Sequence, residues 1–283
     1  GRHLIHLIQK YQIEYEDIGL GDCDETIILK SERSGFWDES EVIEYDDNDM
    51  TNHYRKEMTE INLWIKEAEL NYLMPINSET DVDLSERRLR RYFTRGSFES
   101  GGRLFGGFWQ ELNKKQRKNI IIDDEEAVSL DYSQMAPRIL YGLCGTRPIS
   151  EDCYRISGYE RYRSGIKKVF NAMTFADKQM TRFPKGVKQM FKEDIRFQEV
   201  SDAIQRYHSG IAHKFYVGIG HYLQYLESQI LIKVLLGLKE LGIHALPIHD
   251  AVVVGRAWVD MSRQLMEQVF LDMTNVESWV QVE

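Results

Sequence analysis

The sequence predicts an α+β protein in which short apolar strands carry acidic residues at their ends and amphipathic helices cover them. Two observations favour this class. Residues Ala127–Leu130 form an apolar run that leads into Asp131, and residues 245–248 form a second that leads into Asp250. Short runs of this kind, bounded by polar or turn residues, are typical of buried strands. At 283 residues and 42% hydrophobic content, the chain is long enough for a full core in one or two domains.

Helical periodicity supplies the other half of the prediction. The clearest helix is expected over 223–241, where apolar residues recur at intervals of three and four and Gly242 follows. The stripe Met58, Ile61, Ile65, Ala68 and Tyr72 predicts a second helix. Further elements are expected as helices over 4–15, 132–143, 159–180 and 188–207, and as a short strand over 26–29.

The two aspartates are the most informative feature of the chain. A carboxylate on a buried strand is costly unless it is paired or bound to a metal ion. Two such carboxylates, Asp131 and Asp250, therefore suggest a shared metal site on adjacent strands. The alternative is a pair of unrelated aspartates that cap turns at the ends of their strands.

Charge is distributed unevenly along the chain. Residues 1–86 hold 7 Lys/Arg and 22 Asp/Glu, whereas the remaining residues hold 29 and 23, within an overall net charge of −9. The stretch 87–118 has ten basic and two acidic residues, and 155–196 has eleven and four. Such local concentration is what a protein that follows a phosphate backbone needs, although solvated helix faces look the same. We therefore divide the chain into an acidic, mostly helical region, 1–86, and a core, 87–283.

The segment 101–110 places four glycines and three aromatic residues around Arg103. Glycine permits close approach of the backbone to a ligand, and aromatic faces stack on bases. The alternative interpretation is a glycine hinge flanked by packed aromatic residues.

Cysteine content and hydropathy bear on location. The three cysteines have no metal-binding spacing and cannot all pair, which suits a reducing compartment. No apolar run approaches 18 residues. We expect a cytoplasmic protein without a membrane partner.

Three motifs, in order along the chain, resemble those of the family A DNA polymerases. Asp131-Tyr132-Ser133-Gln134, followed by Arg138, resembles motif A, and His249-Asp250 before an apolar run resembles motif C. Between them, the residues that resemble motif B of the fingers helix are Arg163, Lys167, Asn171 and Phe175. The resemblance extends over roughly residues 87–260.

The resemblance implies a polymerase palm, an antiparallel sheet carrying the two aspartates, with helical fingers and a small thumb-like N-terminal region. It implies a DNA polymerase of phage, plasmid or bacterial type that adds nucleotides to a primer 3′ end. Asp131 and Asp250 would be the catalytic residues and would bind two Mg²⁺ ions, or Mn²⁺, with the backbone carbonyl of Tyr132 as a third ligand.

The same resemblance assigns binding roles. The nucleotide would be bound by Arg163, Lys167, Asn171, Phe175 and Tyr132. Primer and template would be contacted by Arg103, Gln110, Arg138 and His249. Lys168 offers a competing register that keeps Asn171 but puts Ser164 in place of the arginine. The partners would be primer–template DNA and dNTP, with a helicase or primase as a candidate partner of the acidic region.

The chain also departs from the family pattern. Met135 and Ala136 replace the Ile-Glu pair that helps to exclude ribonucleotides, and Ala251 replaces an acid that usually follows motif C. Residues 1–86 have no acidic cluster like that of the proofreading exonuclease. DNA or RNA as the product stays open, as do three alternative functions: a template-independent terminal transferase, a non-catalytic nucleic-acid-binding protein on a decayed palm, and a metal-dependent nuclease.

Overall fold

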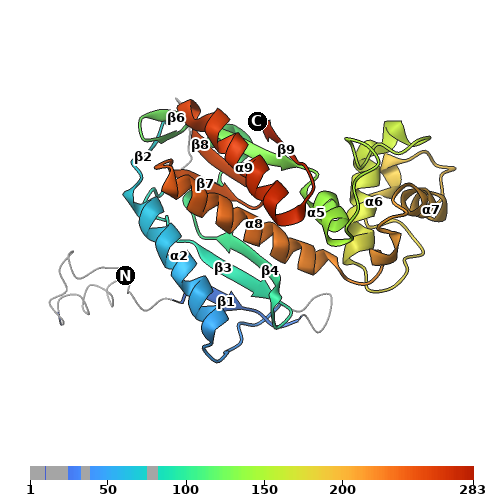
Figure 1. Ribbon diagram of the computed structural model, residues 1–283, viewed down its shortest axis with the longest axis horizontal. Helices are drawn as coiled ribbons and strands as arrows, with labels where there is room; N and C mark the ends of the chain where they lie inside the picture. The colour runs from blue at the N-terminus through green and yellow to red at the C-terminus, as the bar shows by residue number, and fades with distance from the viewer. Residues whose placement is uncertain (1–9, 11–24, 33–38, 75–81) are drawn as a thin grey trace.

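The computed structural model describes residue 10 and residues 25–32, 39–74 and 82–283. It is an α+β protein, as predicted, and the described residues form two sheets and a set of helices that pack against them (Figure 1). No helix in these described ranges is long and apolar enough to cross a lipid bilayer.

The larger sheet is antiparallel throughout and carries both aspartates. Its strands run in the order β2-β5-β6-β8-β7, and β9 pairs with the second half of β6. The bounds are β2 Leu70–Tyr72, β5 Ile120–Ile122, β6 Glu125–Ser133, β7 Ala245–Ile248, β8 Ala251–Gly255 and β9 Trp279–Val282. Since residues 130 and 131 pair with both β8 and β9, β6 is a central strand at the position of Asp131.

The smaller sheet has three strands. Strand β1 (Ile27–Leu29) pairs in parallel with β3 (Arg90–Thr94), which pairs in antiparallel with β4 (Ser97–Phe105). Strand β1 belongs to the acidic first region and β3 to the core. The described part of the acidic region therefore shares a sheet with the residues that follow it.

The helices fall into two groups. Helices α2 (Asp49–Glu67), α8 (Gly220–Glu240) and α9 (Val259–Thr274) lie along the sheets, whereas α6 (Arg163–Phe175) and α7 (Phe197–Tyr207) lie together at one end of the molecule (Figure 1). Helix α8 contacts both groups. The remaining helices of the described residues are α3 Phe108–Glu111, α4 Lys114–Arg117, α5 Met135–Leu143 and the 3-10 turns 160–162, 188–190, 212–214 and 256–258.

Several predicted elements are confirmed and others are corrected. The strands leading to and from the aspartates are present, and α8 ends before Gly242, whose φ is +71°. Helix α2 stops at Glu67 instead of reaching Tyr72, because residues 70–72 pair with β5 and that ladder satisfies their backbone. Likewise, Tyr132 continues β6 rather than starting a helix. Apart from Lys10, the helix expected over 4–15 lies outside the described residues.

Candidate active site

The sheet brings the two predicted aspartates to neighbouring positions. Asp131 of β6 pairs directly with Ala251 of β8, the residue after Asp250, and on its other side with Gln281 of β9. The side chain of Asp131 therefore lies on the same face of the sheet as that of Ala251. Asp250 occupies the two-residue turn that joins β7 to β8, next to His249, whose φ is +56°. The long separation in sequence is therefore closed by strand pairing.

Asp131 has the electrostatic character of a shared carboxylate site. Burial, followed by the negative charges of Asp250 and Glu283, raises the pKa of Asp131 from 3.8 to about 7. The positive charges of Lys167 and Lys114 act in the opposite direction. One carboxylate oxygen, Oδ1, is buried and has no hydrogen-bond partner among the described residues. A cation bound here would relieve both the burial and the repulsion between the acids.

Arg103 reaches the same site from β4 and is held there by a buried acid. Its guanidinium donates to Oε2 of Glu227 on α8 at 3.0 Å, and the Glu227 side chain is only 9% exposed. Burial raises the pKa of Glu227 to about 7, while Arg103 lowers it and the charge of Asp250 raises it further. Burial lowers the pKa of His249 most. The charge of Arg103 lowers it further, and the charge of Asp250 raises it. These four side chains therefore form one electrostatic cluster.

A fully buried arginine on the neighbouring strand β3 is hydrogen-bonded to this part of β4. Arg91 of β3 donates to the carbonyl oxygen of Gly102 at 3.1 Å, and to Ser228 and Gln229 of α8 at 3.0 and 2.6 Å. It also forms an ion pair with Glu57 of α2 at 3.3 Å. Arg91 thus ties two helices to the strand segment that carries Arg103.

The glycines around Arg103 are explained by packing within the protein. A Cβ on Gly102 would lie 2.6 Å from the hydroxyl of Ser228, and one on Gly106 would lie 2.4 Å from the carbonyl oxygen of Arg88. A Cβ on Gly107 would meet the ring of Trp109 at 2.3 Å. Close approach of backbone and side chains therefore requires these glycines, and this favours the packing interpretation over approach to a ligand.

Helix α6 presents the predicted motif B residues along one stripe. Arg163, Lys167 and Phe175 are exposed, and Asn171, at the same i+4 spacing, is half-buried. The charge of Lys167 is among the main influences on the pKa of Asp131, which it lowers. Arg163 is paired with Asp152 at 2.6 Å. Phe175 packs edge-on against His221 at the start of α8.

Other predicted residues have mainly internal contacts. The Tyr132 side chain is buried and donates to the carbonyl oxygen of Met266 at 2.6 Å, so only its backbone remains for a ligand. Arg138 is 2% exposed, donates to the carbonyl oxygens of Glu151 and Glu277, and lies 4.0 Å from the centre of the Trp279 ring. This placement joins the C-terminal strand to the loop before α6 and leaves Arg138 no open surface for DNA.

Gln110 and His249 flank the turn that carries Asp250. The amide nitrogen of Gln110 donates to the carbonyl oxygens of Leu104 and Pro247, each at 3.0 Å, so Gln110 fastens β4 to the β7 strand. His249 is exposed and packs edge-on against the ring of Phe105. Of these two residues, His249 is the one whose side chain is open to a ligand.

The donor set at the site suits a hard divalent cation. Among the described residues, no group of three or more His, Cys, Asp or Glu side chains could hold a metal ion. The two aspartates are therefore a partial ligand set, and Mg²⁺ commonly completes such a set with water and substrate oxygens. Together with the unpartnered Oδ1 of Asp131, this fits a metal that binds with its substrate.

Glu227 and Arg91 were not predicted as site residues. A signal for Glu227 exists in the sequence, since it is an acid inside the strongly apolar stretch 223–238. Charged residues are rarely buried unless they are paired, so its position indicates a buried partner. Nothing local identifies that partner as Arg103, which lies on another strand.

Comparison with known proteins adds little to this site. No protein-family model and no curated protein matches the sequence. Among solved structures, the chain is similar to the POL domain of Pol1 from M. smegmatis, in complex with DNA primer–template and dNTP. The identity is 11%, the TM-score is 0.43, and the match covers 82% of this chain and 51% of that chain. The chain thus spans about half the length of that structure, and a likeness at this level carries no statement about activity.

Proposed function

We propose that this chain is a template-directed nucleotidyltransferase of the DNA polymerase type, which extends a primer 3′ end. The observation that supports it most is the pairing that brings Asp131 beside the turn carrying Asp250. Lys167 supports it further, because the charge of this α6 residue acts on Asp131. Acids on a sheet opposite cations on a helix suit a reaction that handles a triphosphate.

The reaction joins the primer to the α-phosphorus of a nucleotide. A bond forms from the 3′ oxygen to that phosphorus, the bond to the leaving pyrophosphate breaks, and the hydroxyl proton passes to solvent. Bound Mg²⁺, held by Asp131, Asp250 and the carbonyl of Tyr132, would activate the 3′ hydroxyl and neutralise phosphate charge. Lys167 would hold the triphosphate, and Arg163 would join it by leaving Asp152.

Arg103 and His249 are the proposed contacts to the end of the primer. Arg103 is 31% exposed although Glu227 anchors it, so part of its guanidinium can donate to a ligand. Its anchor reduces the entropy lost when it binds. His249 lies beside Asp250 and is exposed. We leave Arg138 and Gln110 out of the set, because Arg138 is buried with both Nη atoms bonded within the protein, and the Gln110 amide nitrogen bonds within the protein too.

Primer extension tests the proposal. With Mg²⁺, primer–template and dNTPs, the unmodified chain should lengthen the primer. Asp250→Asn should reduce the rate of extension more than about a hundredfold, which exceeds the usual effect of losing a residue that only supports a metal ligand. Asp124→Asn is the matched control, since Asp124 lies exposed in the turn between β5 and β6. No product from the unmodified chain, or full activity of Asp250→Asn, would refute the proposal.

The alternative functions give different results in the same assay. Product whose sequence ignores the template indicates a terminal transferase, and loss of DNA without added nucleotide indicates a nuclease. Duplex binding that needs no metal and survives Asp131→Asn, without any product, indicates a binding protein on a decayed palm. Parallel reactions with NTPs decide sugar selectivity, which the small Ala136 leaves open.

A further inference from the structure

Strand β9 brings a further acid to the face of the sheet that carries Asp131. Gln281 of β9 pairs directly with Asp131. Two residues further along, the N–H of Glu283 donates to the carbonyl oxygen of Ser129 at 2.9 Å. Because side chains alternate along a strand, Gln281 and Glu283 lie on the same face as Asp131. The opposite face of β9 is the packed one, since Val280 is buried.

The charge of Glu283 acts on Asp131. Diagonal neighbours across an antiparallel pair lie about 7–8 Å apart at the backbone, within reach of a long side chain. After burial and the charge of Asp250, the charge of Glu283 is the next influence that raises the pKa of Asp131. On the β8 side, Asp131 is paired with Ala251, whose side chain has no ligating atom. The additional negative charge beside Asp131 therefore comes from the β9 side.

Lys114 of α4 opposes that negative charge. Its Nζ pairs with Oε1 of Glu283 at 3.0 Å, and its own charge lowers the pKa of Asp131. Both side chains of the pair are partly exposed, so the pair can separate into water at little cost. A divalent cation bound by Asp131 would compete with Lys114 for the Glu283 carboxylate.

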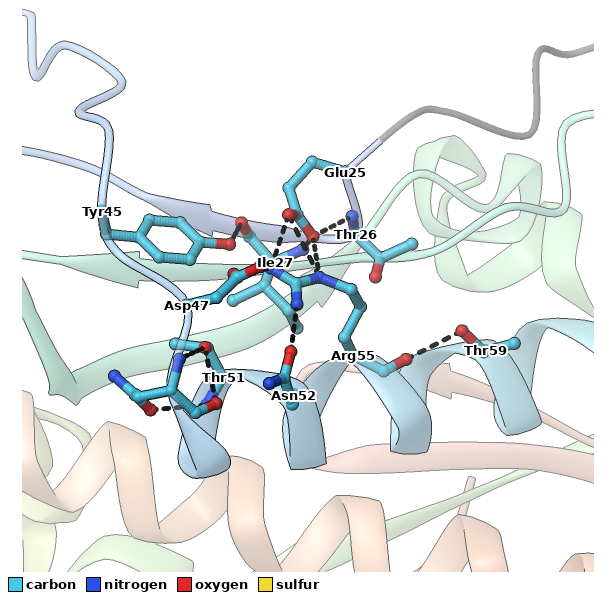
Figure 2. Close-up of polar contacts among 10 residues, drawn as sticks. Glu25, Thr26, Ile27, Tyr45, Asp47, Thr51, Asn52, Arg55 and Thr59 are labelled. Atoms are coloured by element: carbon cyan, nitrogen blue, oxygen red, sulfur yellow. Dashed lines mark hydrogen bonds and ion pairs between the residues drawn. The ribbon is translucent and has the colours of Figure 1, made fainter.

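Glu283 differs from an acid whose role is structural. The carboxylate of Glu25 accepts from Arg55 at 2.9 to 3.2 Å and from two backbone N–H groups, as Figure 2 shows. These contacts use both carboxylate oxygens and join the start of β1 to α2. In the described part of the chain, by contrast, the Glu283 carboxylate is paired with Lys114 through Oε1 and stays 32% exposed. Glu283 is therefore available to a ligand at the Asp131 face.

We propose that Glu283 is a further acid of the candidate active site, which strengthens the binding of a divalent cation by Asp131 and Asp250, and that Lys114 limits this effect. Glu283 would act across bound water, since Mg²⁺ keeps several of its waters in such sites. A carboxylate that accepts from those waters stabilises the bound ion without being a ligand. The inference rests on the metal site of the proposed function and not on the reaction.

Titration of the free chain with Mn²⁺, followed by electron paramagnetic resonance of the unbound ion, tests the role of Glu283. Glu283→Gln should weaken Mn²⁺ binding about tenfold, because the loss of a residue that supports a metal site commonly has an effect of this size. Lys114→Gln should tighten Mn²⁺ binding about threefold, since it removes an exposed competing cation. Glu283→Asp, which keeps the carboxylate, should bind Mn²⁺ more tightly than Glu283→Gln.

Glu126→Gln is the matched control. Glu126 lies five residues before Asp131 on β6, about 17 Å away along the strand. It is also paired with a cation, Arg256, at 2.7 Å. The variant therefore removes the same charge from an ion pair of the same sheet, and it should bind Mn²⁺ like the unmodified chain.

Two results would overturn the proposed role of Glu283: no Mn²⁺ binding by the unmodified chain, or equal Mn²⁺ affinities of the unmodified chain and Glu283→Gln. Weaker binding by Lys114→Gln would also contradict it, because the ion pair would then act only as a structural contact.

Primer extension separates this inference from the proposed function. Mn²⁺ binding that weakens in Glu283→Gln, without any primer extension by the unmodified chain, keeps the role of Glu283 and refutes the polymerase. Primer extension that requires Asp250, together with equal Mn²⁺ affinities, keeps the polymerase and refutes the role of Glu283.

Discussion

The two basic stretches of the chain, 87–118 and 155–196, have similar numbers of cations but use them differently. In the first, the structure withdraws arginines into the protein: Arg91 is fully buried and Arg103 is paired with a buried acid. In the second, all eleven cations remain exposed. The first stretch uses arginines for internal bonding, and the second keeps its cations at the surface, with the charge of Lys167 acting on Asp131.

The difference shows what charge density in a sequence can establish. Arginine has five donors in a planar fork and is weakly hydrated, so it can be buried against carbonyl groups, acids and rings. Lysine is a compact, strongly hydrated charge and stays near water. The stretch 87–118 has six arginines before its first lysine at position 114, and this composition suits internal bonding.

Removing the Arg91 side chain should give the largest effect. Arg91→Met leaves the carbonyl oxygen of Gly102 and the groups on α8 without the Arg91 donor and Glu57 without its buried cation, and loss of one partner of a buried ion pair destabilises by about 3–5 kcal/mol. Unfolding in urea, read by circular dichroism, measures this. Lys168→Gln, an exposed cation of the second stretch, should stay within about 0.5 kcal/mol of the unmodified chain. Comparable losses would contradict the distinction drawn between the stretches.

Lys167 and Lys168 provide a second test on one helix. If Lys167 holds the triphosphate, Lys167→Gln should raise the KM for dNTP about tenfold or more, while Lys168→Gln changes it little. Steady-state primer extension at saturating DNA measures both. The reverse order of effects would favour the register in which Lys168 is the binding cation and would leave the proposed reaction intact.

The sequence predicts the parts of the site that rest on local pattern and not those that rest on distant partners. Apolar runs ending at Asp131 and Asp250 predicted their strands, and i+4 spacing predicted the exposed stripe of α6. The role of Arg138 could not be predicted, because the Trp279 ring that it covers is more than 130 positions away. The glycines of 101–110 had two interpretations, and only the contacts with Ser228 and Trp109 distinguish them.

The pH dependence of stability should reveal the acid pair. In the folded chain the pKa of Asp131 is about 7, above the ordinary 3.8, so the folded state holds its proton more tightly than the unfolded state. Its contribution is fully present below about pH 4 and is lost as the pH rises through 7. We therefore compare the melting temperatures of Asp131→Asn and the unmodified chain without metal. The difference in favour of Asp131→Asn should grow by at least about 2 °C from pH 4 to pH 8.

Calorimetry across this pH range measures the difference, and Mg²⁺ extends the test. At pH 8, added Mg²⁺ should raise the melting temperature of the unmodified chain more than that of Asp131→Asn, because only the former keeps both carboxylates. A difference between the two chains that does not change with pH would mean that neither burial nor the charge of Asp250 raises the pKa of Asp131 in the folded chain.

The smallest effect is expected where a cation of the first stretch remains at the surface. Lys114 pairs with Glu283 at 3.0 Å, but the two side chains are 57% and 32% exposed. An ion pair of this kind contributes less than about 1 kcal/mol, and salt screens it. Lys114→Gln should therefore change the free energy of unfolding by less than that amount, and less still in 0.5 M salt. Suppose that Lys114→Gln lowered the free energy of unfolding as much as Arg91→Met does. The contribution of a cation to stability would then depend on its position in the stretch and not on its burial.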